Sequence, residues 1–331
     1  MIRIKDIAKE AGVSPTTVSN VIHGNTKKVS RANIEKIQKI LEEHQYIPSM
    51  SALMLAENRS RLIGMLIGER EGKRRNIASD PFTSIILNAL ELEIYRQNYY
   101  MLFHMAGSQE ESWKLALTWK VEGLITLGLS SEENLELQEK CQVPLVSIDN
   151  YYEGKSVANI GLQDFEGGYA MGRYLVQRGL KDLLFLADND RGVDHERFMG
   201  FWKAVNEAGG KCRAGQRIIP ENQEMRRVWM EDHIEDLLKH DGLFFASDYY
   251  AMEGIHFLQD RGYSVPGDIS VAGFDDSPYA EMCRPKITTV RQNVVKKGQE
   301  TVRRLMCLIQ EREFQGCERL PAELVPRDST K

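Results

Sequence analysis

The chain has few cysteines, and their arrangement does not suit a disulfide or metal framework. Its five cysteines are an odd number, and none of them form a Cys-x-x-Cys pair. This usage favours a reducing compartment and argues against a zinc site. No apolar run approaches the length of a membrane span, and the N-terminus lacks the apolar core of a signal peptide. We therefore expect a cytoplasmic protein that has no membrane partner.

The short motifs of common enzymes are also missing. The sequence contains no His-Glu-x-x-His, no Gly-x-x-x-x-Gly-Lys and no Gly-x-Ser-x-Gly, and its seven histidines do not cluster. His195 stands beside Glu196, but neighbours at the start of a helix rarely face each other. An enzyme is therefore disfavoured, and we expect no catalytic residue, cofactor or metal ion.

A helix-turn-helix pattern occupies residues 4–24. Apolar residues at helical spacing from Ile4 to Ala11 predict a first helix, which Gly12 ends. Ser14 and Pro15 suit the N-cap and the first position of a second helix. The apolar residues of that helix would face the first helix and leave short polar groups outward, as a reader of the DNA major groove requires. The alternative is an ordinary helical hairpin with a polar outer face.

A third helix and a short apolar segment complete the first 60 residues. Ser30 suits the N-cap of the third helix, whose apolar stripe begins at Ile34, and Tyr46-Ile47-Pro48 ends it. The apolar segment at 50–55 is too short to be a stable helix alone in water, so we expect it to order only against DNA and a second copy. A fragment of a core helix is the alternative.

The charge is divided unevenly along the chain. The first 60 residues hold nine lysines and arginines and six acidic residues, whereas the whole chain has 43 and 48. A basic head on an acidic body suits contact with nucleic acid through the head alone, although a solvated basic surface would have the same composition.

From Leu62 onward, apolar strands alternate with helices. This alternation predicts parallel sheets covered by helices on both faces, and a chain of 331 residues is long enough for a short module and a bilobed one. Ligands of such folds bind beyond the carboxyl ends of the strands. The predicted strands are 62–67, 99–104, 123–127, 144–149, 183–186, 242–246 and 270–274, and the predicted helices are 83–98, 110–119, 169–178, 197–208 and 250–260.

These features resemble the LacI-GalR family of bacterial transcription regulators. The head matches in IKDIAKEAGVSPTTVSNVIHG at 4–24, in Val29-Ser30 and in Tyr46-Ile47-Pro48. The remainder matches in Asp80-Pro81-Phe82, 163–168, 196–201, 246–254, 265–276 and 320–325. The resemblance implies an α/β fold in which an all-α head and a hinge helix precede a two-lobed domain like a periplasmic sugar-binding protein, with two parallel sheets.

The resemblance also implies the domain organisation. A helix-turn-helix head at 1–47 and a hinge helix with linker at 48–60 would precede an effector-binding and dimerisation domain at 61–331. Within that domain we expect an N-subdomain at 61–160 and 291–320, and a C-subdomain at 161–290 and 321–331.

The family's DNA-contacting positions fall on the head and the hinge. Pro15, Thr16 and Asn20 hold base-reading positions, while Ala52 and Leu55 hold minor-groove positions, where Leu55 is the wedge. Asn20 stands where arginine is usual, which shifts the preference from guanine towards adenine. The hinge also departs from the family, with Ala52-Leu53 in place of Ala-Arg. Further candidate DNA contacts are Lys5, Ser14, Thr17, Ser19, His23 and Asn25.

The positions that line the family's effector cleft are held by Phe82, Asp149, Arg197, Asp248 and Asp275. These residue types suit a sugar, because carboxylates accept from hydroxyls, a guanidinium donates in a fixed fork and an aromatic ring covers an apolar face. Asp248 is equally suited to cap the helix near Tyr250, and Asp164 is suited to cap the one near Gly167.

A charged loop at 69–76 follows the first strand. Its Lys73, Arg74 and Arg75 would suit a phosphorylated or acidic effector, and a solvated surface loop is the alternative. Taken together, the sequence predicts a homodimeric repressor that binds near-palindromic operator DNA under the control of a sugar-like small-molecule effector. The alternative is a cytoplasmic sugar-binding module without operator function.

Overall fold

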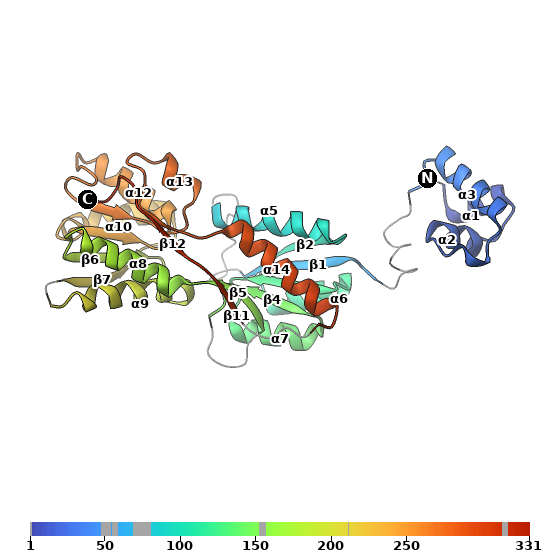
Figure 1. Ribbon diagram of the computed structural model, residues 1–331, viewed down its shortest axis with the longest axis horizontal. Helices are drawn as coiled ribbons and strands as arrows, with labels where there is room; N and C mark the ends of the chain where they lie inside the picture. Colours follow the sequence, from blue (N-terminus) through green and yellow to red (C-terminus); the bar gives the residue numbers. More distant parts are fainter. Residues whose placement is uncertain are drawn as a thin grey trace. The chain divides into compact units, whose positions relative to one another are not determined.

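The computed structural model describes residues 2–47, 54, 59–68, 81–151, 157–210, 212–312 and 317–331. Figure 1 shows the elements of its two compact units, Met1–Arg61 and Leu62–Lys331. The hinge candidates Ala52 and Leu55, and the charged loop at 69–76, lie outside the described residues.

The first unit contains helices α1 (Ile4–Ala11), α2 (Pro15–Ile22) and α3 (Arg31–Glu43), with a 3-10 turn, η1 (Thr26–Lys28), between the last two. The predicted N-caps are confirmed: the hydroxyl of Ser14 accepts from the Thr17 N–H, and that of Ser30 accepts from the Asn33 N–H. Gly12 ends α1 in the left-handed conformation, with φ at 70°. The shared core comprises Ile7, Ala8, Ala11, Val18, Val21, Ile37 and Ile40.

The second unit begins with an N-lobe built on a parallel six-stranded sheet, in the order β11-β5-β4-β3-β1-β2. Its strands are β1 (Leu62–Gly68), β2 (Tyr100–Ala106), β3 (Gly123–Leu127), β4 (Leu145–Ile148), β5 (Ala158–Leu162) and β11 (Cys317–Leu320). Its helices are α5 (Pro81–Arg96), α6 (Gln109–Trp119), α7 (Ser131–Cys141) and α14 (Val294–Ile309).

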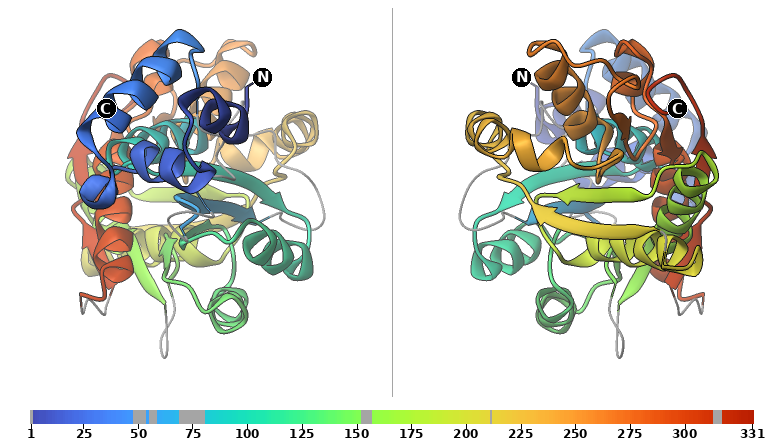
Figure 2. Two further views of the ribbon diagram at one scale, coloured as in Figure 1. Left: turned by 90° about the vertical axis from the view of Figure 1, so that its right-hand side faces the viewer. Right: turned by 90° about the vertical axis from the view of Figure 1, so that its left-hand side faces the viewer.

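The two-residue period of β1 explains how helices come to cover both faces of this sheet. Ile63, Met65 and Ile67 join the buried cluster that includes side chains of α5 and α14. Leu66 instead joins the cluster that includes side chains of α6 and α7. Helices accordingly lie on both sides of the strands (Figure 2).

A C-lobe follows, built on a parallel four-stranded sheet in the order β7-β6-β8-β9. Its strands are β6 (Asp182–Ala187), β7 (Arg213–Ile218), β8 (Gly242–Phe245) and β9 (Ser270–Ala272). Its helices are α8 (Asp164–Gln177), α9 (Gly192–Glu207), α10 (Gln223–Asp232), α11 (Ile234–Leu237), α12 (Asp248–Gln259) and α13 (Pro278–Met282). An antiparallel pair, β10 (Thr289–Arg291) with β12 (Glu323–Val325), completes the unit.

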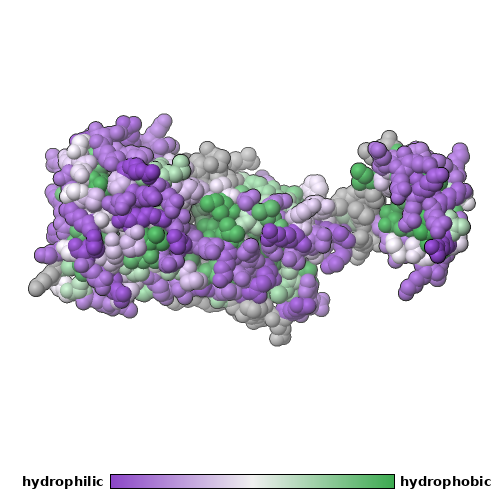
Figure 3. Space-filling model, turned by 45° about the horizontal axis from the view of Figure 1, so that its top comes forward, coloured by the Kyte–Doolittle hydropathy of each residue, from purple (hydrophilic) through white to green (hydrophobic). Residues whose placement is uncertain are grey.

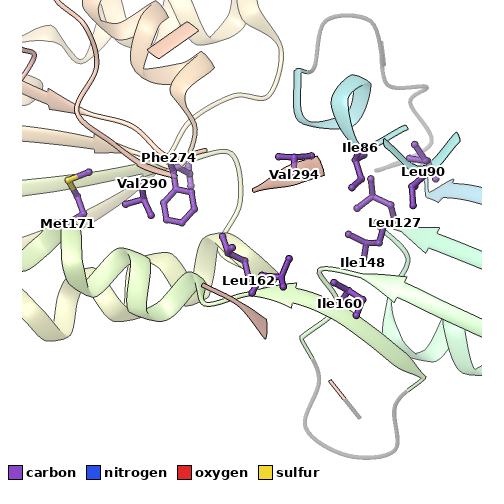
Figure 4. Close-up of a cluster of buried hydrophobic side chains, with 14 of the residues drawn as sticks. Ile86, Leu90, Leu127, Ile148, Ile160, Leu162, Met171, Phe274, Val290 and Val294 are labelled. Carbon is purple, nitrogen blue, oxygen red and sulfur yellow. The ribbon is translucent and has the colours of Figure 1, made fainter. Parts of the chain in front are cut away.

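The chain passes between the lobes at 162–164, 291–294 and 320–323. One buried apolar cluster continues through these crossings, because it contains side chains of both sheets as well as Leu162 and Val294. Figure 4 shows Met171, Phe274 and Val290 on one side of them and Ile86, Leu127 and Ile148 on the other. The lobes therefore share apolar packing where the chain crosses.

The α/β alternation predicted from Leu62 is confirmed, and the strand at 123–127 has the predicted bounds. Among the elements that the sequence pattern did not predict are β5, β7, α7, α10 and α14. In β7 the cause is its position at the edge of the sheet, where its side chains are half-buried or exposed and the apolar signal is weak. The third helix of the head ends at Glu43, which is earlier than Tyr46-Ile47-Pro48 suggested.

Candidate functional site

The second helix of the head presents a short polar surface. Ser14, Pro15 and Thr16 are exposed, whereas Val18 and Val21 are buried in the head core. The Ser14 hydroxyl also lies 2.9 Å from that of Thr17, so the two side chains form a small hydrogen-bonded unit at the start of α2. The N-terminal turn of α2 is therefore both rigidly capped and accessible.

The remaining head candidates surround this helix. Ser19, Asn20 and His23 are half-buried, while Lys5 on α1 and Asn25 after α2 are exposed. The backbone N–H of Asn25 donates to the carbonyl of Asn20 over 2.8 Å, which fixes the turn that follows α2. The structure thus brings the predicted DNA contacts at 5–25 into one small unit.

In the second unit, Arg197 is the centre of a buried charged cluster. Its Nε donates to Asp164 Oδ1 over 2.7 Å, and its Nη1 donates to the carbonyl of Ala246 over 2.7 Å. The guanidinium also lies 3.7 Å from the Asp275 carboxylate and stacks on the Phe274 ring, 3.8 Å from its centroid. Burial disfavours its charge, but these carboxylates outweigh that effect and raise the pKa of Arg197.

Close packing of two helices places Arg197 beside Asp164. A Cβ on Gly168 of α8 would lie 2.0 Å from the Arg197 carbonyl oxygen, and one on Gly200 of α9 would lie 1.9 Å from that of Phe165. Only glycine allows the two backbones to approach so closely. Gly168 and Gly200 belong to two of the motifs singled out in the sequence, so those motifs specify helix packing as well as side-chain chemistry.

The two aspartates that follow sheet strands adopt backbone conformations that are unusual for non-glycine residues. Asp149 follows β4 with φ at 54°, and Asp275 lies beyond β9 with φ at 110°. Such conformations cost about 1–3 kcal/mol each and concentrate at functional sites. Both carboxylates lie beyond the carboxyl ends of parallel strands, where ligands of open α/β sheets bind.

Asp149 forms an ion pair that the sequence did not suggest. The ammonium of Lys297, on α14, lies 2.8 Å from each carboxylate oxygen of Asp149 and 2.8 Å from Gln292 Oε1. Gln292 in turn donates through Nε2 to Asp275 Oδ1 over 2.6 Å. Burial raises the pKa of Asp149, against the lowering effect of the Lys297 charge. Lys297 is also 5.2 Å from the ring centroid of Phe82, on α5.

Asp248 is fully buried rather than open to solvent. Its carboxylate accepts from the Thr289 hydroxyl over 2.6 Å and from the Ser277 N–H over 2.7 Å. Burial, together with the nearby charge of Asp275, raises its pKa well above the usual range. The N-cap of α12 is Ser247, whose hydroxyl accepts from the Tyr250 N–H, so the structure gives the capping role to the preceding residue.

Asp164 likewise does not act as a helix cap. Gln163 is the N-cap residue of α8, and the Asp164 side chain accepts from Arg197 and from the hydroxyl of Tyr151. Tyr151, which was not predicted from the sequence, stands two residues after Asp149 and also accepts from the Leu162 N–H over 2.9 Å. Burial raises the pKa of Tyr151, which keeps its proton on the hydroxyl.

A separate surface pocket lies in the N-lobe, lined by residues that include Gly68, Ser108, Trp113, Gly128 and Glu136. None of the five predicted effector residues lines it. Among the described residues, no three histidine, cysteine, aspartate or glutamate side chains are placed to hold a metal ion. In the same part of the chain, no helix combines the length and hydropathy required of a membrane span.

A three-helix head followed by two parallel-sheet lobes is the architecture of a helix-turn-helix protein with a periplasmic-binding-protein-like domain. The family model described as bacterial regulatory proteins, lacI family, matches residues 3–49. The model of the periplasmic binding protein-like domain matches residues 173–330.

Curated relatives match along the whole chain. The HTH-type transcriptional repressor PurR of Vibrio atlanticus is 30% identical over 342 residues, which cover 100% of this chain and 99% of PurR. The HTH-type transcriptional regulator MalR of Clostridium butyricum is 32% identical over 346 residues, with 99% of each chain covered. The chain belongs to the lacI family of bacterial regulatory proteins. Like these relatives it is a transcriptional regulator and not an enzyme.

Solved structures confirm the fold. The lac repressor dimer bound to operator and the anti-inducer ONPF matches with a TM-score of 0.87, 24% identity and 99% of each chain covered. A LacI family regulator from Enterococcus faecium with bound ribose matches with a TM-score of 0.70 and 25% identity, over 81% of this chain and 98% of that one.

Proposed function

We propose that this chain is a dimeric repressor that binds a near-palindromic operator through α2 and releases or engages it in response to a sugar-like effector. The observation that carries the proposal is the capped, exposed start of α2, where Pro15 and Thr16 are accessible while Val18 anchors the helix in the core. The N-terminal end of a recognition helix is the part that meets base edges in the major groove.

Within this reading, Pro15, Thr16 and Asn20 contact bases, and Lys5, Ser14, Thr17, Ser19, His23 and Asn25 contact the backbone or support the helix. An asparagine side chain can bond adenine at two positions in the major groove, so Asn20 selects adenine at its base pair. Ala52 and Leu55 of the hinge enter the minor groove at the operator centre, and Leu55 unstacks the central step.

The charged cluster in the second unit is the proposed effector site. Arg197 offers fixed donors and Asp275 offers acceptors beyond the ends of strands β6, β8 and β9, which suits a molecule rich in hydroxyl groups. Bound ribose in the Enterococcus faecium relative, and cellobiose in the complex of the regulator CelR, support the choice of a sugar. Asp248 helps to fix the backbone segment that contains Asp275, because its carboxylate accepts a hydrogen bond from the Ser277 N–H.

Exposed apolar side chains support a homodimer. Edge strand β2 exposes Tyr100 and Phe103, and the C-lobe exposes Met225, Val228 and Met282. Figure 3 shows hydrophobic residues gathered on the face of the second unit that carries α5. Apolar patches of this kind mark association surfaces, and the relative with a TM-score of 0.87 is a dimer. A two-fold dimer would match a near-palindromic operator.

We propose the domain division 1–47, 48–60 and 61–331, with an N-subdomain at 61–160 and 291–320 and a C-subdomain at 161–290 and 321–331. Strand β5 moves the first of these lobe boundaries slightly, because its residues Gly161 and Leu162 still pair with β11 in the N-lobe sheet. The boundary between the two compact units, which falls between Arg61 and Leu62, supports the division between the hinge and the effector domain. A regulator of this kind acts in the cytoplasm, where the chromosome is accessible.

The test is selection of bound sequences from random duplexes by the purified full chain, repeated at two salt concentrations. We expect an enriched near-palindrome with a deformable central step at both concentrations, with weaker overall binding at higher salt. If no sequence is enriched, even with added sugars, the chain is a sugar-binding module without operator function.

A further inference from the structure

Lys297 occupies an unusual place for a lysine. Its side chain is 1% exposed, and it lies in the first turn of α14, where the helix dipole disfavours a positive charge. A lysine is rarely fully buried unless its charge is paired. The surroundings must therefore supply enough compensating contacts to hold an ammonium group there.

The contacts of Lys297 provide one acceptor for each N–H of its ammonium group. The three N–H groups of the ammonium face the two carboxylate oxygens of Asp149 and the amide oxygen of Gln292, each 2.8 Å away. The ring of Phe82 lies within cation–π range. Carboxylate, amide carbonyl and aromatic face are the groups with which a binding site recognises a small organic cation.

Two members of this set are predicted effector contacts. Asp149 and Phe82 were assigned to the effector from the sequence, yet in the structure both contact Lys297. We propose that Lys297 is a built-in occupant of the effector site, which fills the N-lobe half and leaves effector recognition to the C-lobe residues Arg197 and Asp275. This inference rests on the proposed function, because it takes the charged cluster to be the effector site.

The same ammonium is linked to both lobes. Gln292 lies where the chain crosses between the lobes, and its amide accepts from Lys297 and donates to Asp275. The link continues through Arg197 to Asp164 and to the hydroxyl of Tyr151, on the N-lobe side. A ligand that closes a bilobed domain contacts both lobes. Lys297 makes the N-lobe contacts directly and is linked to the C-lobe residue Asp275 through Gln292.

The charges around Lys297 and Arg197 restrict the chemistry of the effector. Since the Lys297 charge already compensates Asp149, this ion pair is neutral and needs no donor from the effector. In the C-lobe half, the described side chains place Arg197 among Asp164, Asp194 and Asp275, and this surplus of carboxylates over the guanidinium disfavours an anion beside them. The effector is therefore an uncharged polyhydroxyl molecule rather than a sugar phosphate or a sugar acid.

Truncation and chemical rescue test the built-in occupant. Lys297→Ala removes the side chain beyond Cβ, and n-propylammonium has the atoms of the part removed. We expect Lys297→Ala to lower the thermal midpoint of the full chain by several degrees, and n-propylammonium chloride to restore it saturably. Potassium chloride at equal ionic strength and n-propanol should not. Lys296→Met, at an exposed neighbouring position, is the matched control and should keep the wild-type midpoint.

The absence of any saturable response of Lys297→Ala to n-propylammonium, with the variant folded, overturns the proposal. Should that variant not fold, lysine side-chain ¹⁵N NMR on the wild-type chain decides. We expect one slowly exchanging ammonium signal that is lost in the volume-conserving Lys297→Met, and that persists when D-ribose or cellobiose is added. No protected signal, or its loss on adding either sugar, contradicts the built-in occupant. Neither experiment uses DNA, so a failure here is distinct from a failure to find an operator.

A comparison of a neutral sugar with its phosphate tests the expected charge of the effector. Titration calorimetry of the wild-type chain should find tighter binding of D-ribose than of D-ribose 5-phosphate. A preference for the phosphate contradicts the inference about the effector's charge and leaves the operator assay unaffected.

Discussion

Gly168 of α8 faces the backbone carbonyl of Arg197 on α9 so closely that a Cβ would lie 2.0 Å from the oxygen. This contact links fold and site, because Arg197 carries the hydrogen bonds to Asp164 and Ala246. Helix packing at one glycine therefore sets the position of the guanidinium at the centre of the charged cluster.

Gly168→Ala should destabilise the second unit. In a free helix alanine is favoured over glycine by about 1 kcal/mol, but here the helices must separate, and overpacking of this kind costs about 1–3 kcal/mol or more. Urea unfolding of the full chain measures the loss. Gly210→Ala is the control, since a Cβ there has no heavy atom within 4 Å, and it should not destabilise. Equal stability of the two variants would show that α8 and α9 adjust freely.

Ser14→Ala should loosen the start of the recognition helix. The Ser14 hydroxyl accepts from the Thr17 N–H, and loss of such a cap costs about 1 kcal/mol. Hydrogen exchange of the peptide that covers α2 should therefore accelerate, whereas Ser14→Asn, which can also cap, should keep exchange near the wild-type rate. Unchanged exchange in Ser14→Ala would mean that the cap does not limit the order of α2.

Asp248→Asn should raise stability at neutral pH. Burial raises the folded-state pKa of Asp248, so folding favours the protonated carboxyl. Its stabilising contribution is fully present below the unfolded pKa, about 3.9, and is lost as pH rises towards the folded value. The uncharged amide lacks this dependence and can bond both Thr289 and Ser277. Urea unfolding at several pH values between acid and neutral should show that the variant's excess free energy of unfolding over the wild type grows with pH. An excess that does not change with pH would show that ionisation of Asp248 is not its cause.

These residues show where prediction from sequence succeeds. Ser14 and Ser30 were predicted as caps because a cap depends on a few neighbouring residues. Arg197 and Asp275 were also assigned to one site, and the structure places them 3.7 Å apart although they are distant in sequence. Their proximity was expected from motif resemblance alone, since no local pattern brings the two together, and their role towards an effector stays a prediction.

Other residues of the cluster could not be predicted from the sequence, for physical reasons. Lys297 follows Lys296 on a strongly amphipathic helix, where a lysine ordinarily indicates solvent, and only tertiary packing against Asp149 buries it. Tyr151 carried no motif, and its role depends on the chain crossing that brings Asp164 near. For Asp248 the sequence left capping and binding equally open, and in the structure the cap of α12 is the hydroxyl of the preceding Ser247.

Leu55→Ala should weaken specific operator binding without altering stability or effector binding. The Leu55 side chain acts as a wedge only when the hinge contacts DNA. Inserting a wedge unstacks a base step at a cost of a few kcal/mol, and the smaller alanine side chain cannot hold the step open in the same way. Electrophoretic mobility shifts on the selected operator, beside a duplex of unrelated sequence, measure the effect. Retained operator affinity would remove Leu55 from the DNA contacts.

Sequence-specific DNA binding by the head can be measured by competition between two duplexes. The selected near-palindrome and a scrambled duplex of equal length and composition are titrated with the full chain by fluorescence anisotropy at physiological salt. We expect at least about 10³-fold tighter binding of the selected duplex, with two protomers on each. Equal affinity for the two duplexes would contradict it.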